Sequence, residues 1–265
     1  MPSTERYLYA FVTEPVEAPL REGIGGNPIF FIEGPTIDGT TVYAAVSGAP
    51  KGRVRAQRKH LSAHQRVVSA LAGRITTLPA AFGLVAEEDA IRSLLDFHAG
   101  PIIDTIASVG GCVEMTLCVK WDNPDAFGVL VELDDELRAL RDELVEHGDA
   151  APHDLRVAVG RRVETVLGSI RTDHAGVAFA AVGPTCRDIQ DDDALDASEL
   201  VKLHCLVERG GVEAFEAAIG ELAEELDDSY VIAVSGPFAP HHFVNLELDF
   251  SAFASEPEDA SAAAS

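Results

Sequence analysis

The chain has 265 residues, 47% of them hydrophobic, and its 44 acidic and 20 basic side chains give a formal net charge of −24. A surface this acidic repels nucleic acid and anionic membranes, so the composition argues against both as partners. Lysine is scarce, and most of the basic residues are arginine. Because salt at about 1 M shortens the Debye length to about 3 Å and screens self-repulsion, the composition predicts an acidic protein from a halophilic, haloarchaeal-type source.

No apolar run approaches the roughly 18 residues that suggest a membrane-spanning helix. The first residues also lack the basic and then apolar pattern of a secretory signal. The four cysteines form no CxxC pair, and three of them lie in apolar, strand-like runs, where cysteine behaves as a small hydrophobe. We therefore expect a soluble cytoplasmic protein with reduced thiols, and a disulfide or metal role is the weaker interpretation.

Residues 1–110 are expected to form a small α+β domain. Residues rich in Tyr, Phe and Val predict a strand at 6–13, and two further runs, 29–32 and 41–47, predict a β-hairpin. The turn between those two runs contains Gly34, Pro35, Asp38 and Gly39. The apolar segment 75–86 is interrupted by proline and glycine, which favours an irregular edge strand.

Two helical regions are predicted in this first domain. Apolar residues recur at helical spacing over 54–72, with basic residues largely on the opposite side. The second region begins with acidic residues at 87–89, which suits the helix dipole. Pro101 is expected to interrupt it, leaving a second short helix at 102–109.

Residues 111–253 are expected to form a ferredoxin-like domain, and 254–265 a disordered acidic tail. The period of the apolar residues predicts a strand, two helices, two strands, a helix and a strand. These elements are placed at 112–121, 127–147, 155–170, 177–182, 199–208, 212–226 and 230–235. The order is the βαββαβ order of the ferredoxin-like fold, with a helical hairpin at 127–172 inserted in the first crossover. Residues 183–195 are read as a loop, and Pro237 is expected to end the last strand.

Five leucines in the predicted helix 127–147 follow a 3–4–3–4 spacing. This spacing is typical of the seam of a coiled coil. Only two to three heptads are present, so we favour a hairpin within the chain over a coiled coil between chains. The leucines are Leu130, Leu133, Leu137, Leu140 and Leu144.

No catalytic motif is complete in this sequence. His60 and His64 lie four residues apart and could share a helix face, but the segment HLSAH lacks the glutamate of HExxH. His241 and His242 follow the last strand on a proline-containing turn, where a structural or solvent-facing role is favoured over a metal. The residues alone thus predict a two-domain, non-enzymatic interaction protein without a cofactor or metal site.

Five segments, in order, resemble the F/L family of gas vesicle proteins. They are RYLYAFV at 6–12, VYAAVS at 42–47, His64–Leu71 with TLPAAFGLV at 77–85, the strand at 112–120, and GPFAPHHFV at 236–244. The chain departs from the family pattern at Ala80 and Ala81, Phe238 and His241. These departures put in doubt any contact that depends on the family's usual residues there.

The resemblance implies an accessory or minor structural protein of the gas vesicle. It implies binding to the hydrophobic shell protein and to other accessory proteins, preventing aggregation and helping to nucleate assembly. Beside the five leucines, the candidate interaction residues are Pro79, Phe82, Gly83, Gly236, Pro237, Phe238, Pro240 and Phe243. Two other readings stay open: a ferredoxin-like regulatory module that binds a small molecule, and a metal-dependent enzyme using His60, His64 or His241.

Overall fold

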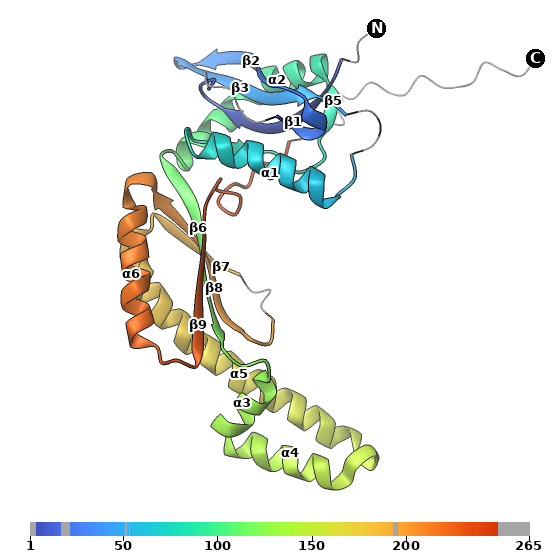
Figure 1. The fold of residues 1–265 in the computed structure, drawn as a ribbon, viewed down its shortest axis with the longest axis vertical. Helices are drawn as coiled ribbons and strands as arrows, with labels where there is room; N and C mark the ends of the chain where they lie inside the picture. The colour runs from blue at the N-terminus through green and yellow to red at the C-terminus, as the bar shows by residue number, and fades with distance from the viewer. Residues whose placement is uncertain (1–3, 17–21, 51, 53, 193–195, 249–265) are drawn as a thin grey trace, which may run out of the picture. The chain divides into compact units, whose positions relative to one another are not determined.

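The computed structural model describes residues 4–16, 22–50, 52, 54–192 and 196–248 (Figure 1). The chain divides into two compact units, Met1–Glu114 with Pro237–Ser265, and Met115–Gly236. The sequence placed the first boundary near 110 and assigned everything from 111 to 253 to one domain. The structure instead returns the residues after Gly236 to the first unit. The predicted tail at 254–265 lies outside the described residues.

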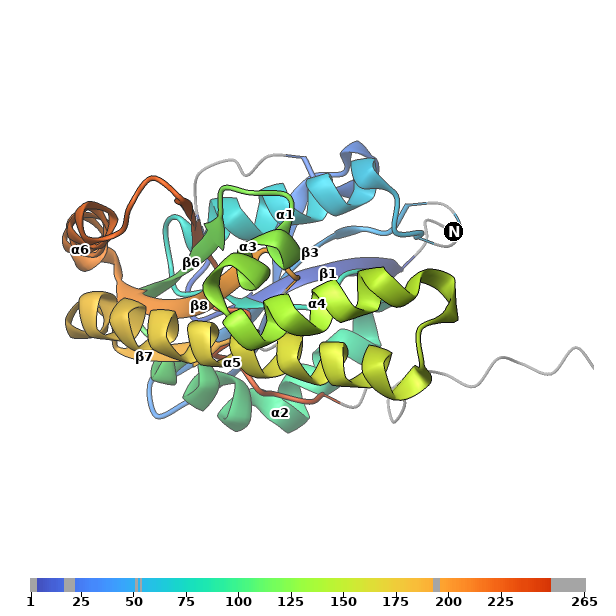
Figure 2. The same cartoon turned by 90° about the horizontal axis from the view of Figure 1, so that it is seen from below.

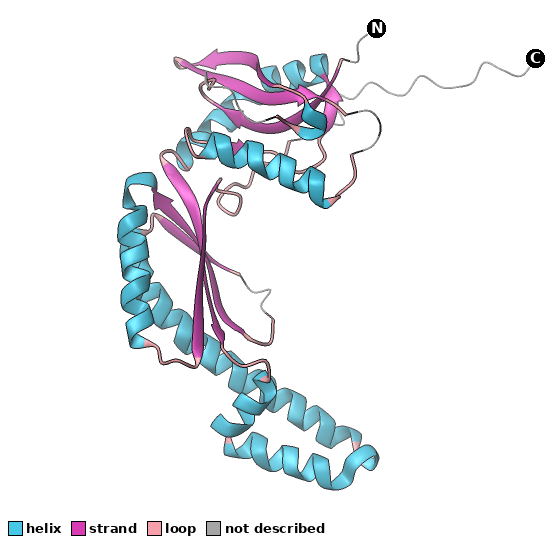
Figure 3. Ribbon diagram, in the orientation of Figure 1, coloured by secondary structure: helices cyan, strands magenta, loops and turns pink. Residues whose placement is uncertain are grey.

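Each unit is an antiparallel sheet with helices, so the predicted α+β class is confirmed (Figure 3). Within the described ranges, no helix is both long enough and apolar enough to span a membrane. Short 3-10 helices connect several elements. They lie at Ile24–Gly26, Gly148–Ala150, Gly183–Thr185 and Arg209–Gly211.

The first sheet has the strand order β2-β3-β1-β4, with β5 also paired to β1. Its strands are β1 (Glu5–Val12), β2 (Ile29–Ile37), β3 (Thr40–Gly48), β4 (Leu78–Pro79) and β5 (Val85–Glu87). The predicted hairpin of β2 and β3 is confirmed, and its turn is Asp38–Gly39, where both residues have positive φ. Gly34 and Pro35 lie inside β2, at a register shift, and not in the turn as predicted.

Helices α1 (Arg58–Ala72) and α2 (Glu88–Ser108) pack on opposite faces of this sheet (Figure 1). A register shift in β1 after Leu8 lets the neighbouring Tyr9 and Ala10 face the same core, that of α1. Pro101 lies inside α2, so the predicted break is wrong. Apolar side chains on both sides of the proline are buried against the sheet, and this burial outweighs the roughly 3 kcal/mol that an internal proline costs a helix.

The second sheet has the strand order β7-β8-β6-β9. Its strands are β6 (Cys112–Trp121), β7 (Asp188–Asp191), β8 (Glu199–Glu208) and β9 (Tyr230–Phe238). Strand β7 occupies part of the predicted loop 183–195, because its polar residues find backbone partners on β8. Strand β9 continues through Gly236 and Pro237 to Phe238, three residues beyond the predicted end.

Four helices belong to the second unit: α3 (Ala126–Leu133), α4 (Asp135–His147), α5 (His153–Val182) and α6 (Val212–Glu225). Figure 2 shows α4 beside α5, and the favoured intramolecular hairpin is confirmed. The predicted strand at 177–182 is wrong, since these residues form the last turns of α5. There Ala178 and Val182 enter the core with Phe215 of α6.

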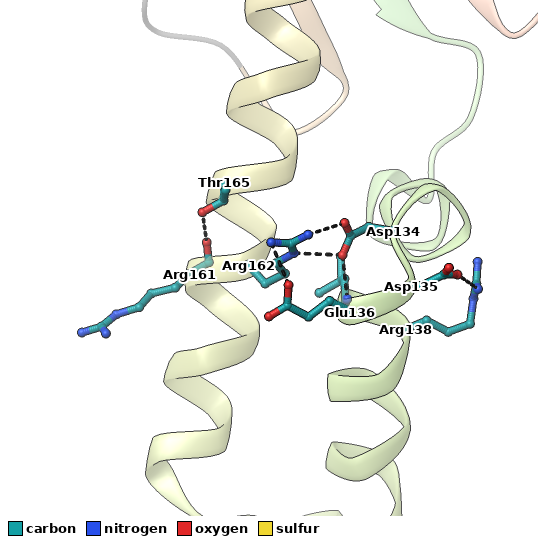
Figure 4. Close-up of polar contacts among 8 residues, drawn as sticks. Asp134, Asp135, Glu136, Arg138, Arg161, Arg162 and Thr165 are labelled. Atoms are coloured by element: carbon teal, nitrogen blue, oxygen red, sulfur yellow. Dashed lines mark hydrogen bonds and ion pairs between the residues drawn. The ribbon is translucent and has the colours of Figure 1, made fainter.

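The predicted helix 127–147 is broken at Asp134, which ends α3 and caps α4. Its carboxylate accepts a hydrogen bond of 2.7 Å from the backbone N–H of Leu137. Arg162 of α5 binds the same carboxylate through Nε at 2.9 Å and Nη2 at 2.6 Å, and it contacts Glu136 at 2.9 Å (Figure 4). The guanidinium lowers the pKa of Asp134 to about 2. The ion pair therefore fixes the corner of the helical hairpin.

Candidate functional site

The first unit has a groove beside α1, with a volume of about 940 Å³. One wall is the outward face of α1, the other is the segment 80–82, and His241 completes the lining. The α1 wall consists of Leu61, Ser62, His64, Gln65, Arg66, Ser69 and Ala70. Two of the five segments that carry the family resemblance, His64–Leu71 with 77–85 and 236–244, thus meet in this groove.

The amphipathic pattern of α1 explains why this wall faces outward. Ala63, Val67, Val68 and Leu71 are buried against the sheet, and the intervening residues remain exposed or half-buried. His64 belongs to the buried set and is only 6% exposed. The helix therefore places one imidazole at the base of the groove while its polar side chains form the rim.

His64 is held by Tyr7 of β1. The Tyr7 hydroxyl lies 3.0 Å from Nδ1 of His64 and accepts a hydrogen bond of 2.9 Å from the backbone N–H of Gly83. The imidazole also hydrogen-bonds the backbone of Ala80. Because the hydroxyl accepts from Gly83 and the Ala80 carbonyl can only accept, this network favours a Tyr7 proton donated to Nδ1 and an imidazole proton on Nε2.

Burial moves the pKa values of His64 and Tyr7 away from neutral pH. It lowers the pKa of His64 to about 4, and the nearby His241 adds a smaller shift in the same direction. Burial also raises the pKa of Tyr7 to about 12. Partial burial of its ring lowers the pKa of His241. At neutral pH both members of the Tyr7–His64 pair are uncharged, and neither is tuned for proton transfer.

Four rings pack around this hydrogen bond. The Tyr9 ring stacks on His64 at 5.6 Å between centroids, and Phe82 meets His64 edge-on at 5.7 Å. Tyr7 lies 4.8 Å from Tyr9 and 6.3 Å from Phe82. The Tyr9 hydroxyl accepts from the backbone N–H of Ile24 at 2.8 Å. This aromatic cluster, Tyr7, Tyr9, His64 and Phe82, gives the groove a rigid base.

The segment after β9 is anchored at Glu114. His242 donates from its backbone N–H to one Glu114 oxygen at 3.0 Å, and its Nδ1 lies 2.7 Å from the other. Glu114 is 2% exposed. The alternation of apolar and polar residues predicts outward-facing positions for Glu114 of β6 and His204 of β8, but both are buried. Sequence reasoning did not single out Glu114, because its partner lies 128 residues away.

Beyond this anchor, a short extended segment lies on the α2 side of the sheet. Val244, Leu246 and Leu248 are half-buried and pack against that core. They line a small apolar hollow of about 240 Å³ with residues of β4 and its neighbours. These apolar residues alternate with polar Asn245 and Glu247, which are exposed. The segment therefore packs against the core with its apolar side only.

The histidines that suggested a metal site are otherwise engaged. His60 Nδ1 lies 3.0 Å from the backbone carbonyl of Arg55 at the start of α1. His64 is hydrogen-bonded to Tyr7 as described. The absence of a metal role at both residues stays a prediction. His241 lines the groove near His64.

The predicted interaction residues fall into exposed and buried sets. Leu130, Leu137 and Pro240 are buried, and Leu140 and Leu144 are half-buried against the second core. Pro79, Phe82, Gly83, Phe238 and Phe243 are half-buried. Leu133, Gly236 and Pro237 are exposed, Leu133 by 63%. The structure brings Phe82 into the groove, while the five leucines are split between α3 and α4 and do not form one seam.

Comparison with known proteins identifies the family. The model of the family described as "Gas vesicle synthesis protein GvpL/GvpF" matches residues 5–245. The chain belongs to the GvpL/GvpF family. The match includes the whole groove and the Glu114 anchor, so these features lie inside the family's common region. Membership gives the chain a role in gas vesicles.

Two relatives in the GvpL/GvpF family were compared along most of their length. Gas vesicle protein L1 of Halobacterium salinarum is 25% identical over 257 residues, which cover 91% of this chain and 90% of the relative. Gas vesicle protein F of a Streptomyces species is 26% identical over 202 residues, covering 76% and 83%. The two are similarly distant, so identity does not separate an F-type from an L-type member.

Solved GvpF structures share the fold. The crystal structure of GvpF from Anabaena sp. has a TM-score of 0.75 at 21% identity and covers 92% of this chain and 100% of the solved one. GvpF from Microcystis aeruginosa has the same TM-score and coverage at 20% identity. At this level of identity the likeness concerns the fold alone.

Proposed function

We propose that this GvpL/GvpF member is an accessory or minor structural protein that binds the hydrophobic shell protein and other accessory proteins of the gas vesicle. In this role it keeps the shell protein from aggregating and helps to nucleate assembly. The observation that carries the proposal is the family match over residues 5–245. We also propose that it acts in the cytoplasm and at the gas vesicle, and that its charge is an adaptation to salt.

The distribution of charged and apolar side chains supports a binding role. A net charge of −24 keeps a complex with a sticky client in solution. Helices α3 and α4 nevertheless expose large apolar side chains, Phe127 by 41%, Leu133 by 63% and Val145 by 70%. Exposed apolar groups on a highly charged carrier suit a hydrophobic client.

Several of the predicted interaction residues are buried, which leaves fewer of them for the surface that we propose binds the shell protein. Leu130, Leu137 and Pro240 lie inside the two units, so they support the fold rather than meet a client. Leu133, Gly236, Pro237 and the half-buried Phe82 remain available. We propose that Leu133 and Val145 carry the larger part of the contact, since they are the most exposed large apolar side chains of α3 and α4.

Two finer points belong to the same proposal. We propose that the second unit is a ferredoxin-like domain, supported by its order β7-β8-β6-β9, in which the first strand of the unit lies between the third and the fourth. We also propose that the protein is not an enzyme. In support, the pKa of His64 is about 4 and that of Tyr7 about 12, far from the range that general acid–base catalysis uses at neutral pH.

An aggregation assay tests the proposed function. Shell protein is diluted from denaturant at high salt, and light scattering is followed with and without the intact chain. We expect the wild type to suppress scattering at about equimolar amounts, and the double variant Leu133→Asp, Val145→Asp to lose most of this effect, because two carboxylates replace the apolar contact.

Ala139→Asp is the matched control, because it adds a charge at another exposed position of α4. It should behave as the wild type. Failure of the wild type to bind or protect the shell protein would refute the proposed function. Undiminished protection by the double variant would instead refute this choice of surface.

A further inference from the structure

The basic residues of this acidic chain are unevenly distributed. Residues 39–86 hold seven of its 20 basic side chains and none of its 44 acidic ones. Five of the seven are described, and all five are exposed. They are Arg55, Arg58, Lys59, Arg66 and Arg74. Residues 39–86 therefore form a cationic segment in a molecule that is otherwise strongly anionic.

These five side chains form no ion pair with any carboxylate among the described residues. Basic side chains elsewhere commonly do, as Arg6 and Arg92 do with Glu88, and Lys202 with Asp192. Acidic groups outnumber basic ones more than twofold, so partners within the chain are abundant. The cationic segment is thus kept apart from the carboxylates of its own chain.

The position of two of these cations works against the helix that carries them. Arg58 and Lys59 occupy the first turn of α1, which contains no acidic residue, and Gln57 makes no side-chain cap. The N-terminus of a helix has a partial positive charge, so cations there are unfavourable. The stability of α1 does not account for these charges.

The cationic side chains continue the wall of the groove. Arg58 lies one turn before Ser62, and Arg66 itself lines the groove with Gln65 and Ser69. Residues three and four apart share a helix face, so Arg58, Ser62, Arg66 and Ser69 belong to one side of α1. The opposite wall is apolar, with Ala81 and Phe82, and Leu61 of α1 is 43% exposed. The groove therefore has a cationic rim and an apolar interior.

We propose that this groove binds an acidic, amphipathic segment of a partner protein. Apolar side chains of the segment lie against Leu61 and Phe82, and its carboxylates meet Arg58, Lys59 and Arg66. Charge complementarity selects this occupant, because a cationic rim on an anionic protein attracts an acidic chain while the rest of the surface repels it from other sites. The inference follows from the charge and shape of this face, and it does not depend on binding of the shell protein.

A peptide titration on the intact chain tests the proposal. The probe is a fluorescein-labelled helical peptide of 14 residues with leucine on one face and glutamate elsewhere, and its counterpart has lysine in place of glutamate. Anisotropy is measured at the lowest salt that preserves the native circular dichroism spectrum. We expect the glutamate peptide to bind, the lysine peptide not to bind, and the affinity to fall as salt rises.

Single substitutions locate the site. Arg58→Glu and Arg66→Glu should each weaken binding about tenfold through lost attraction and new repulsion, and Leu61→Ser should weaken it by removing apolar contact. Arg161→Glu is the matched control. It makes the same change of charge on α5, where the side chain points away from the Arg162 network (Figure 4), and it should leave the affinity within about twofold.

Several results would overturn the proposal. One is the absence of wild-type binding to the glutamate peptide, and another is an equal loss in Arg66→Glu and Arg161→Glu, which would reduce the effect to net charge. Tighter binding to phosphatidylserine vesicles or duplex DNA than to the peptide would assign the cationic face to a lipid or a nucleic acid. Thermal unfolding of each variant confirms that the fold is kept. Failure here leaves the shell-protein assay unaffected, so the two hypotheses are tested separately.

Discussion

The contact between Tyr7 and His64 keeps two polar side chains inside an aromatic cluster without a charge. Each would be costly to bury alone, since an unpaired polar group in an apolar site loses its hydration. Their hydrogen bond of 3.0 Å, together with the bonds to Gly83 and Ala80, satisfies both groups. The first unit is therefore built around a neutral imidazole, which has a consequence for its stability in acid.

We expect acid to destabilise the protein through His64. Its pKa is about 4 in the folded chain against an ordinary 6.5. Between these values the unfolded chain binds the extra proton, so the free energy of unfolding rises with pH across this window and is highest above it. The contribution lost between about pH 7 and pH 4 is on the order of 2 kcal/mol. Urea unfolding at several pH values measures it.

His64→Gln tests the assignment, because it removes the titrating group. The variant should be less stable than the wild type at pH 7 and should lose less stability on acidification. His60→Gln is the matched control, since His60 lies one turn earlier on the same helix and touches only the backbone of Arg55. An unchanged pH dependence in His64→Gln would contradict the role given to His64.

Part of this site could be predicted from the sequence. The sequence placed His60 and His64 on one helix, as the structure shows, and the resemblance named the segments that contain Tyr7, Phe82 and His241. Their meeting could not be predicted, because contacts such as Tyr7 with His64 join residues 57 positions apart. A single sequence without an alignment carries no signal for such pairs.

At the scale of elements, the local sequence pattern predicted which helices and strands exist better than it predicted where they begin and end. The 3–4–3–4 leucines correctly indicated helix, but the pattern runs on through Asp134, where the chain breaks into α3 and α4. Asp134 caps α4 at the break, and Arg162, 28 residues away, binds the same carboxylate. The apolar run 177–182 fits strand and helix equally, and packing of α5 against the sheet decides for helix. Strand β7 is polar and became visible only through its pairing with β8.

The packing of α2 on β2 requires a glycine at position 34. A Cβ there would lie 2.9 Å from Cβ of Leu95 and 3.0 Å from Cγ1 of Val42. Because Cβ of Leu95 is fixed to the helix backbone, α2 would have to move away from the sheet. We expect Gly34→Ala to destabilise the protein by about 1–3 kcal/mol, measured as a lower urea midpoint with an unchanged m-value.

Gly220→Ala in α6 is the control for this substitution. A Cβ at Gly220 meets open space, and alanine favours the helix by up to about 1 kcal/mol over glycine. This variant should be as stable as the wild type or more stable. Equal stability of Gly34→Ala and the wild type would show that α2 and the sheet are less closely packed than described.

At the scale of the whole molecule, the second unit is an insertion in the first. Residues 115–236 lie between the two parts of the first unit. The C-terminal part contributes Ala239, which is fully buried beside the aromatic cluster, and Val244, Leu246 and Leu248 against the other core. Among the described residues, the core of the second unit contains none beyond Ile232. The core of the first unit therefore includes residues between 239 and 248, and the described core of the second unit does not.

Truncation after Phe238 should destabilise the first unit and leave the second unit folded. The first unit would lose its apolar cover and leave Glu114 buried without His242, which is costly for a carboxylate. Strand β9 would be retained. We expect hydrogen exchange to accelerate strongly in β1 and β3 and to stay slow in β8. Similar acceleration in all three strands would contradict the independence of the second core.

The insertion also sets an order of events during protein synthesis. Residues 115–236 are synthesised before the last part of the first unit. At about 5–20 residues per second, synthesis of residues 115–236 takes on the order of ten seconds. The first part of the first unit waits for this time before residues 237–248 are made. During that interval the groove beside α1 lacks His241. The newly made protein thus completes its groove only after the second unit and His241 have been synthesised.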